Sequence, residues 1–206
     1  IISEISWCAD RNHSMELVPA IRQIMERSGI NFEHLKAVFV AKGPGGFSAL
    51  RIGLSVAKSV AMAQCIPLIG IATLDIEATP FIGLNVSVCP LIDAGKNLIY
   101  TATYTNQKTK CSTPNYRVES YETLVASHKA KTLYCGEGVG SVAELFETTL
   151  GIDVLLINNP PPTRRPSILA KLGYDRLKKN DLDNVDTLKP IYIRGSQFEV
   201  PTQLTT

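Results

Sequence analysis

A glycine-rich stretch at residues 42–51 is the part of this 206-residue sequence best suited to ligand chemistry. A glycine turn between a buried strand and a helix exposes backbone N–H groups at the positive end of the helix dipole, where phosphates bind. Ser48 replaces the third glycine of a dinucleotide fingerprint, and no Gly-Lys-Ser/Thr follows to make a Walker loop. We therefore favour a structural turn with close helix-to-strand contact, and anion binding stays open. The loop residues in question are Gly43, Pro44, Gly45, Gly46, Phe47 and Arg51.

A row of small residues with four-residue spacing follows this loop. Its members are Ala49, Gly53, Ala57 and Ala61, and Leu50, Leu54 and Lys58 lie beside them. Residues four apart share one face of a helix, and small side chains there let another helix approach closely. Two interpretations follow. Either the row packs on the chain's own sheet or first helix, or it docks a helix of a partner.

Other residues that could do chemistry form weaker patterns. His13, His34 and His128 are far apart, so neighbouring histidines cannot make an H-x-x-x-H metal site. Ser48 and Ser55 have no histidine or aspartate nearby in sequence to activate them as nucleophiles. We expect neither a metal site nor a catalytic residue in this chain.

A turn is predicted at residues 93–95, Asp-Ala-Gly, between two apolar segments, and Lys96 and Asn97 follow it. We favour a plain hairpin turn in which Gly95 supplies a positive φ.

The composition limits the class of protein. Hydrophobic residues make up 45% and charged residues 19%, which provides enough apolar material for a core. The formal charge of +2 predicts no strong field toward nucleic acid or membrane, and no apolar run is long enough to span a bilayer. Five scattered cysteines without a C-x-x-C pair favour buried, reduced thiols and a cytoplasmic location.

The order of predicted elements favours an α/β fold with two lobes, residues 1–84 and 85–206, with the extreme C-terminus returning to the first lobe as an alternative. Residues 1–7 alternate loosely and resemble a strand, and Ser14 is a plausible cap for the first helix. The Gly-Pro-rich turns separate strands and helices of ordinary length. We expect strands near 37–41, 67–71, 86–92, 98–104, 116–120, 131–135 and 154–157, and helices near 14–28, 48–63, 141–150 and 167–179.

The sequence of the glycine-rich stretch resembles the G-P-G-S-F-T-G-L-R-I-G motif of the TsaB (YeaZ) family. Supporting segments are residues 13–14, 57–58, 67–70, 91–94 with Tyr100, 136–138 and 188–194. The resemblance implies the two-lobe actin-like ATPase fold (ASKHA, ribonuclease H-like). Gly46, Ser48 and Ala49 replace the usual Ser, Thr and Gly. Nothing matches the family's first strand, which ends in Asp-Thr-Ser, so we expect that strand to be missing from the first lobe.

The resemblance also implies a function. The family's members are non-catalytic subunits of the bacterial machinery that makes N6-threonylcarbamoyladenosine at position 37 of tRNA. The implied partners are the catalytic paralogue TsaD, the ATPase subunit TsaE and tRNA through the complex. ATP and metal are expected in the partner subunits and no cofactor in this one, while homodimerisation of the isolated chain stays open. The alternative is an autonomous nucleotide-dependent carbamoyl transferase or a glycoprotease-type peptidase.

Finally, the resemblance implies where partners bind. In the family the first two helices pack against their counterparts on the catalytic partner. The implied interface residues are Met15, Val18, Ala49, Leu50, Gly53, Leu54, Ala57, Lys58 and Ala61. A basic cluster could contact tRNA, although a solvated helix face is the default interpretation of such a run. Its members are Arg164, Arg165, Lys171, Arg176, Lys178 and Lys179, with Asp175 as the one acid among them. The candidate tRNA contacts within it are Arg164, Arg165 and Lys171.

Overall fold

The computed structural model describes residues 1–8, 12–105, 115–129, 131–151, 154–158 and 162–193. The helices are α1 (His13–Ser28), α2 (Phe47–Gln64), α3 (Thr73–Ala78), α4 (Tyr121–Ala126), α5 (Val139–Leu150) and α6 (Pro166–Lys178), with 3₁₀ turns at Phe32–His34 and Thr79–Phe81. The strands are β1 (Val38–Ala41), β2 (Leu68–Ile71), β3 (Ser87–Gly95), β4 (Leu98–Thr101), β5 (Arg117–Ser120), β6 (Thr132–Cys135) and β7 (Leu155–Leu156). The α/β class and each predicted strand and helix from residue 14 onward are confirmed, with boundaries shifted by a few residues.

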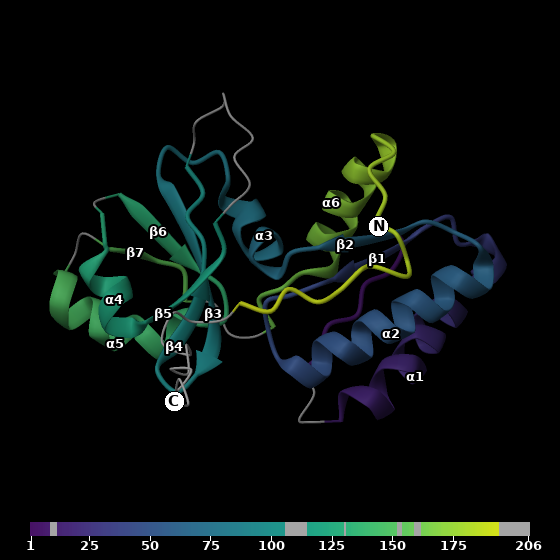
Figure 1. Ribbon diagram of the computed structural model, residues 1–206, viewed down its shortest axis with the longest axis horizontal. Coiled ribbons are helices and arrows are strands. Elements are labelled where there is room, and N and C mark those ends of the chain that lie inside the picture. The colour runs from purple at the N-terminus through teal and green to yellow at the C-terminus, as the bar shows by residue number, and fades with distance from the viewer. Residues whose placement is uncertain (9–11, 106–114, 130, 152–153, 159–161, 194–206) are drawn as a thin grey trace, which may run out of the picture.

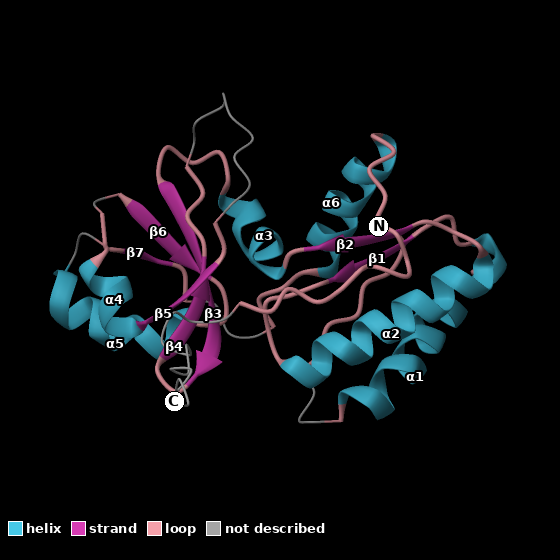
Figure 2. Ribbon diagram, viewed as in Figure 1, coloured by secondary structure: helices cyan, strands magenta, loops and turns pink. Residues whose placement is uncertain are grey.

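The strands form two separate sheets, which makes the molecule two-lobed (Figures 1 and 2). In the first sheet β1 and β2 pair in parallel, from Val38 with Leu68 to Ala41 with Ile71. The second sheet has the order β5-β4-β3-β6-β7, antiparallel on the β4 side of β3 and parallel on the β6 side. Helix α3 joins the two sheets.

The first sheet is covered on both faces by helices. Helix α2, with α1 outside it, lies below the β1–β2 pair in Figure 1, and α6 lies above it. Both strands are apolar, as expected in a parallel sheet covered by helices. All four residues of β2 are buried, whereas Val40 is the buried residue of β1. The core on the α2 side consists of Val40, Leu54, Ala57, Ala61, Leu68 and Leu188.

The C-terminal part of the described chain packs with the first lobe. Helix α6 contacts β1 and β2, and the N–H of Asp183 donates to the carbonyl of Leu68 at 3.1 Å. Leu188 is buried in the first core, and the N–H of Ile191 donates to the carbonyl of Lys42 at 2.7 Å. The sequence range 85–206 therefore includes a long segment, from α6 to the end of the described residues, that belongs to the first lobe in space.

The start of the chain differs from the prediction. Residues 1–8 form no strand, and Ile1 and Ile2 are exposed. A strand needs a neighbouring edge to pair with, and no pairing involves these residues. The cap of α1 is Asn12 rather than Ser14, so the helix begins one residue before the predicted cap.

The cysteine prediction is half right. Cys89 and Cys135 are buried free thiols, whereas Cys8 and Cys65 are free but exposed. Cys111 lies outside the described residues. No helix in the described part of the chain combines the length and apolar character needed to cross a membrane.

Candidate functional site

The glycine-rich loop connects β1 to α2 and lies against two other segments of the chain. Gly43 has a φ of +99°, and a Cβ there would lie 2.9 Å from Cδ1 of Leu50 and 3.0 Å from the carbonyl oxygen of Ile191. Its own carbonyl accepts a hydrogen bond from the N–H of Thr73 at 2.8 Å. Gly43 is therefore required for close backbone approach, which confirms the structural interpretation of this position. Pro44 is also buried, whereas Gly46 at the start of α2 is exposed.

An aromatic and cationic cluster lies at the end of this loop. The rings of Phe47 and Tyr192 have centroids 5.4 Å apart and are tilted by 32°. The guanidinium carbon of Arg51 lies 3.8 Å from the centroid of the Phe47 ring, and Nε of Arg51 donates to the hydroxyl of Tyr192 at 3.1 Å. Sequence reasoning identified Phe47 and Arg51 but did not bring Tyr192 to them, because the contact joins segments 141 residues apart. Arg194, the last residue of the 188–194 segment that contains Tyr192, lies outside the described residues.

The row of small residues on α2 is divided between the core and a groove. Ala57 and Ala61 are buried, as are Leu50 and Leu54 beside the row. Leu54, Ala57 and Ala61 pack with Val40 and Leu68 of the first sheet, so this face of α2 contacts its own lobe. The assignment of these buried residues to a partner interface stays a prediction, which their burial does not support.

Three members of the row, Ala49, Gly53 and Ala57, line an apolar groove of about 560 Å³ between α1, α2 and β1, as does Leu50 beside the row. The apolar stripe of α1, including Leu17 and Ile21, forms its other side. All four residues of β1 also line the groove, and among the described residues β1 pairs with β2 alone. The expectation that the first lobe lacks a strand stays a prediction.

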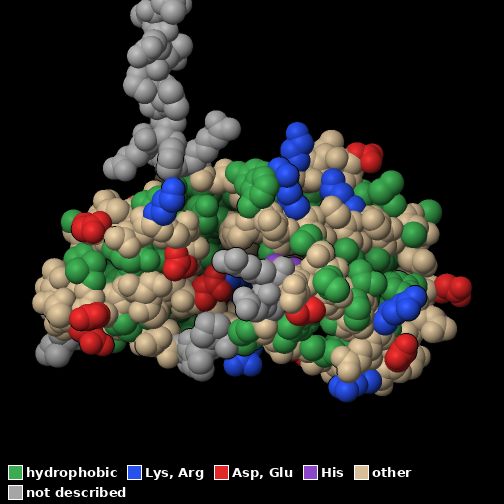
Figure 3. Space-filling model, turned by 90° about the horizontal axis from the view of Figure 1, so that it is seen from below, with side chains coloured by type: hydrophobic (Ala, Val, Ile, Leu, Met, Phe, Trp, Pro, Cys, Tyr) green, Lys and Arg blue, Asp and Glu red, His purple; other side chains and the backbone are tan. Residues whose placement is uncertain are grey.

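The exposed candidates for partner contact lie on α1. Met15 is 75% exposed and Val18 is 47% exposed, at the three-residue spacing that places both on one side of the helix. Figure 3, which views the molecule from the side of α1 and α2, shows apolar side chains on this face among separate charged ones. Lys58 on α2 is engaged within the chain, because its Nζ donates to the carbonyl of Asp186 at 3.3 Å.

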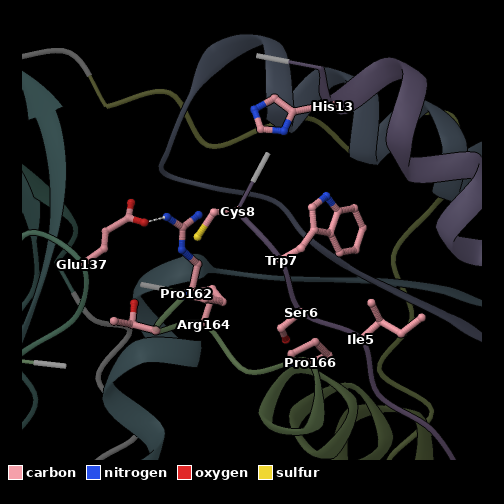
Figure 4. A pocket seen from close by; sticks show the side chains of 10 residues that line it. Ile5, Ser6, Trp7, Cys8, His13, Glu137, Pro162, Arg164 and Pro166 are labelled. Atoms are coloured by element: carbon pink, nitrogen blue, oxygen red, sulfur yellow. Dashed lines mark ion pairs between the residues drawn. The ribbon is translucent and has the colours of Figure 1, made fainter. Parts of the chain in front are cut away.

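An ionic cluster joins the two lobes around Arg164. Its guanidinium pairs with Glu137, which precedes α5 of the second lobe (Figure 4). The same guanidinium lies 3.6 Å from Glu77 of α3. The hydroxyl of Thr163 also donates to Glu77 at 2.5 Å. Burial raises the pKa of the Glu77 carboxyl, and the Thr163 hydrogen bond and the Arg164 charge partly offset this rise. A pocket of about 370 Å³ opens beside Arg164 and is also lined by Trp7, Cys8 and His13.

The basic cluster is less cationic in space than in sequence. Arg176 pairs with Asp181 at 2.7 Å and with Asp183 at 3.1 Å, and Lys178 lies 3.8 Å from Asp175. Three of the six cations, Arg164, Arg176 and Lys178, therefore have acidic partners, whereas the sequence placed only Asp175 beside the cluster. Arg165 and Lys171 are exposed and have no ion pair among the described residues, whereas Arg164 is held between the lobes. The tRNA assignment for Arg164 therefore loses its support.

The turn after β3 is a hairpin turn, as favoured from the sequence. β3 and β4 pair antiparallel around it, and Gly95, Lys96 and Asn97 all have positive φ. A carboxylate oxygen of Asp93 accepts the N–H of Gly95 at 2.6 Å and so closes the turn. No group of three His, Cys, Asp or Glu side chains within the described ranges is placed to hold a metal ion.

The two-lobed α/β architecture is that of the actin-like proteins, and comparison with solved structures supports the assignment. The structure titled "YeaZ from Pseudomonas aeruginosa" superposes with a TM-score of 0.72, covering 89% of this chain and 85% of that one at 22% sequence identity. At that identity the match establishes the fold.

Sequence comparison establishes the family. The family model described as TsaD, tRNA N6-adenosine threonylcarbamoyltransferase, matches residues 7–134, more than half of the chain, and the chain belongs to this family. Two relatives that match along most of their length are both called tRNA threonylcarbamoyladenosine biosynthesis protein TsaB. The one from Bacillus subtilis is 26% identical over 97% of this chain and 87% of its own length, and the one from Haemophilus influenzae is 28% identical over 94% and 84%. The resemblance to TsaB (YeaZ) proteins is thereby confirmed.

Proposed function

We propose that this chain is a TsaB-type subunit in the formation of N6-threonylcarbamoyladenosine on tRNA. The observation that carries the proposal is the similarity along nearly the whole chain to proteins named for this biosynthesis. By contrast, a TsaD-type relative from Trichlorobacter lovleyi, called tRNA N6-adenosine threonylcarbamoyltransferase, is 38% identical over 31% of this chain but only 18% of its own length. The similarity to TsaB proteins, unlike that to the transferase, therefore extends over both chains.

The finer proposal is that the chain is a non-catalytic partner of a TsaD-type protein. It rests on the sequence, in which no two histidines have the spacing expected of the catalytic paralogue's metal site. ATP and metal would then be bound by partner subunits, and a TsaE-type ATPase, tRNA and self-association of the chain stay predictions. A cytoplasmic location fits this role and is proposed with it.

The exposed side of α1 is the surface that we propose for the partner. Met15 and Val18 present apolar side chains to solvent, whereas the buried side of α2 is occupied by the chain's own core. Binding energy at an interface concentrates in a few central apolar contacts. A partner helix packed along α1 would bury both side chains together.

Mixing experiments test the function and the surface separately. The purified chain alone should neither hydrolyse ATP nor transfer a threonylcarbamoyl group, and it should bind the TsaD-type protein of the same organism and enable that protein to modify tRNA. Activity of the isolated chain would instead favour the autonomous enzyme.

For the surface, Met15→Asp combined with Val18→Asp should weaken binding of the TsaD-type protein by at least about 2 kcal/mol, the size of a hot-spot loss. Unfolding of the isolated chain should change by less than about 0.5 kcal/mol per site, because both positions are exposed. Tyr174→Ser on α6, where the ring is 54% exposed, is the matched control and should leave binding unchanged. Equal binding by the Asp variant and the control would refute this surface.

A further inference from the structure

The cluster of Phe47, Arg51 and Tyr192 is an ordered aromatic surface that the proposed partner contact on α1 does not use. Phe47 is 54% exposed and Tyr192 is 49% exposed, so each ring presents surface to solvent. Single exposed apolar side chains are common and need no explanation. Here, however, two rings and a guanidinium from distant segments are held together by a hydrogen bond and by stacking contacts.

The backbone around the cluster holds it in place. Phe47 is the first residue of α2, and Arg51 lies one turn further along the same helix. Tyr192 follows Ile191, whose N–H donates to Lys42 at 2.7 Å and whose carbonyl lies against Gly43. Phe47 and Arg51 therefore stand on a helix, and the hydrogen bond of Ile191 ties the segment of Tyr192 to the end of β1 before any ligand arrives, which lowers the conformational entropy lost on binding.

The charges beside the rings favour a polyanion. Among the described residues no carboxylate pairs with Arg51, and its bonded nitrogen is Nε, toward Tyr192. Exposed Lys189 precedes Tyr192 by three residues, and Lys58 lies two turns beyond Arg51 on α2, while Asp186 is the nearby acid. Aromatic faces with adjacent arginine are the surfaces on which proteins stack unpaired bases of RNA.

The rest of α2's outward side argues against a protein interface centred on these rings. Over the three turns of the helix that follow Phe47, the exposed positions are Ser48, Arg51, Ser55 and Ser59, and the exposed apolar side chain of Met62 comes only in the last turn. The centre of a protein interface is usually apolar and depleted of charge, whereas this surface combines two aromatic rings with a polar and cationic surround. An unpaired nucleic-acid base stacked on the rings, with its phosphate backbone beside the cations, fits that combination better.

We propose that Phe47, Arg51 and Tyr192 form a stacking site for an unpaired base of RNA, with tRNA as the ligand. The inference rests on the proposed function in tRNA modification. The ring of Tyr192 or Phe47 would stack on the base, and the guanidinium of Arg51 would bind a neighbouring phosphate.

Binding of a tRNA transcript to the complex of this chain with its TsaD-type partner tests the site. At least one of Phe47→Ala and Tyr192→Ala, the one that removes the stacked ring, should weaken tRNA affinity by about 5- to 150-fold, the effect of losing one stacked base. Tyr192→Phe keeps the ring and should change affinity by less than about threefold. Arg51→Ala should also reduce the dependence of log affinity on log salt by about one unit, because one phosphate contact is lost.

Tyr174→Ala is the matched control. Its ring is as exposed as that of Phe47 and carries a cation, Lys178 Nζ at 4.4 Å from the centroid, but it lies on α6, across the first sheet from α2 (Figure 1). This variant should bind tRNA as the unchanged chain does. Equal tRNA affinity of Phe47→Ala, Tyr192→Ala and the control Tyr174→Ala would overturn the inference. A loss of partner binding by Phe47→Ala or Tyr192→Ala would also overturn it, because the cluster would then be a protein interface.

Photocrosslinking of the unchanged complex to tRNA containing 4-thiouridine keeps the test independent of how the variants fold. A crosslinked peptide containing Phe47 or Tyr192 is expected, and crosslinks confined to other peptides would overturn the inference. The modifying activity of the unchanged complex is measured first. If the complex modifies no tRNA, the proposed function fails; if it does and the variants bind normally, the stacking site alone fails.

Discussion

The same substitution at two helix glycines should have opposite effects on stability. Alanine in a helix interior is favoured over glycine by up to about 1 kcal/mol. At Gly53 in α2 an added Cβ meets no atom within 4 Å, so the chain should gain that amount. At Gly173 in α6 the Cβ would lie 2.3 Å from Cγ of Phe39 and 2.6 Å from Cδ1, well inside the 3.4 Å at which ordinary contact begins.

Rotation of the Phe39 ring about χ2 does not relieve the contact at Gly173, because it leaves Cγ in place. Either Phe39 must change χ1 within the packed lobe or β1 or α6 must shift, and such overpacking costs about 1–3 kcal/mol. Subtracting a helix preference of about 1 kcal/mol leaves a net loss of up to about 2 kcal/mol for Gly173→Ala. A chain of this size changes its melting temperature by about 2–4 °C per kcal/mol. We therefore expect a fall of up to about 8 °C for Gly173→Ala and a rise of about 1–4 °C for Gly53→Ala.

Thermal unfolding followed by circular dichroism, together with urea unfolding, measures both variants. Adding Phe39→Leu to Gly173→Ala should recover part of the loss, because the smaller side chain vacates the space that the Cβ needs. The reasoning is refuted if Gly173→Ala melts at or above the temperature of the unchanged chain. A fall for Gly53→Ala would show that the groove beside α2 is filled in solution.

Two further predictions concern the link between the lobes. Arg164→Met leaves Glu77 and Glu137 without the cation that pairs with both. It should lower the free energy of unfolding by about 1–2 kcal/mol, less than for a fully buried pair because Arg164 is partly exposed. Urea unfolding measures the loss, and Arg165→Met at an exposed position is the control that should show none. Burial raises the pKa of the Glu77 carboxyl above 4.5 in the folded chain, so folding favours the protonated carboxyl. The contribution of Glu77 to the free energy of unfolding is therefore fully present below pH 4.5 and is lost as the pH rises through the folded-state pKa. Relative to Glu77→Gln, the unchanged chain should therefore gain stability as the pH falls from 7 toward 4.5, and a constant difference between the two across that range would contradict the assignment.

Local patterns predicted the elements well because each of them is encoded within a short window. The buried strands β1 and β2, the helix after the glycine-rich loop and the hairpin after β3 all follow from apolar runs, glycines and spacing. Helices α3 and α4 were missed, because six residues are too few to show a helical period. The strand predicted for residues 1–7 was wrong because strand formation depends on a neighbouring edge, which a local pattern does not reveal.

The contacts that define the candidate sites join residues far apart in the chain. Arg164 was counted as a free cation because its partners, Glu77 and Glu137, lie outside its own segment. Asp183 likewise forms an ion pair with Arg176 of α6, and it also accepts a hydrogen bond from the N–H of Gly70 in β2 at 2.8 Å. Charge counts over a sequence window overestimate a basic patch when acids from another element fold onto it.

The side of α2 that a partner or an RNA can reach follows from what already covers the helix. Ala57 and Ala61 are small because α2 packs closely on β1 and β2, so this half of the row makes contact within the lobe, whereas Ala49 and Gly53 line the groove. The opposite side, which begins at Phe47 and Arg51, is left to solvent, and the exposed apolar side chains of α1 lie on the neighbouring helix. Because Met15 and Val18 are on α1 while the stacking rings are on α2 and the C-terminal segment, one set of variants can remove protein binding without touching the rings. A chain that loses the partner through the α1 variants should still yield crosslinks at Phe47 or Tyr192 if the base stacks on this subunit itself.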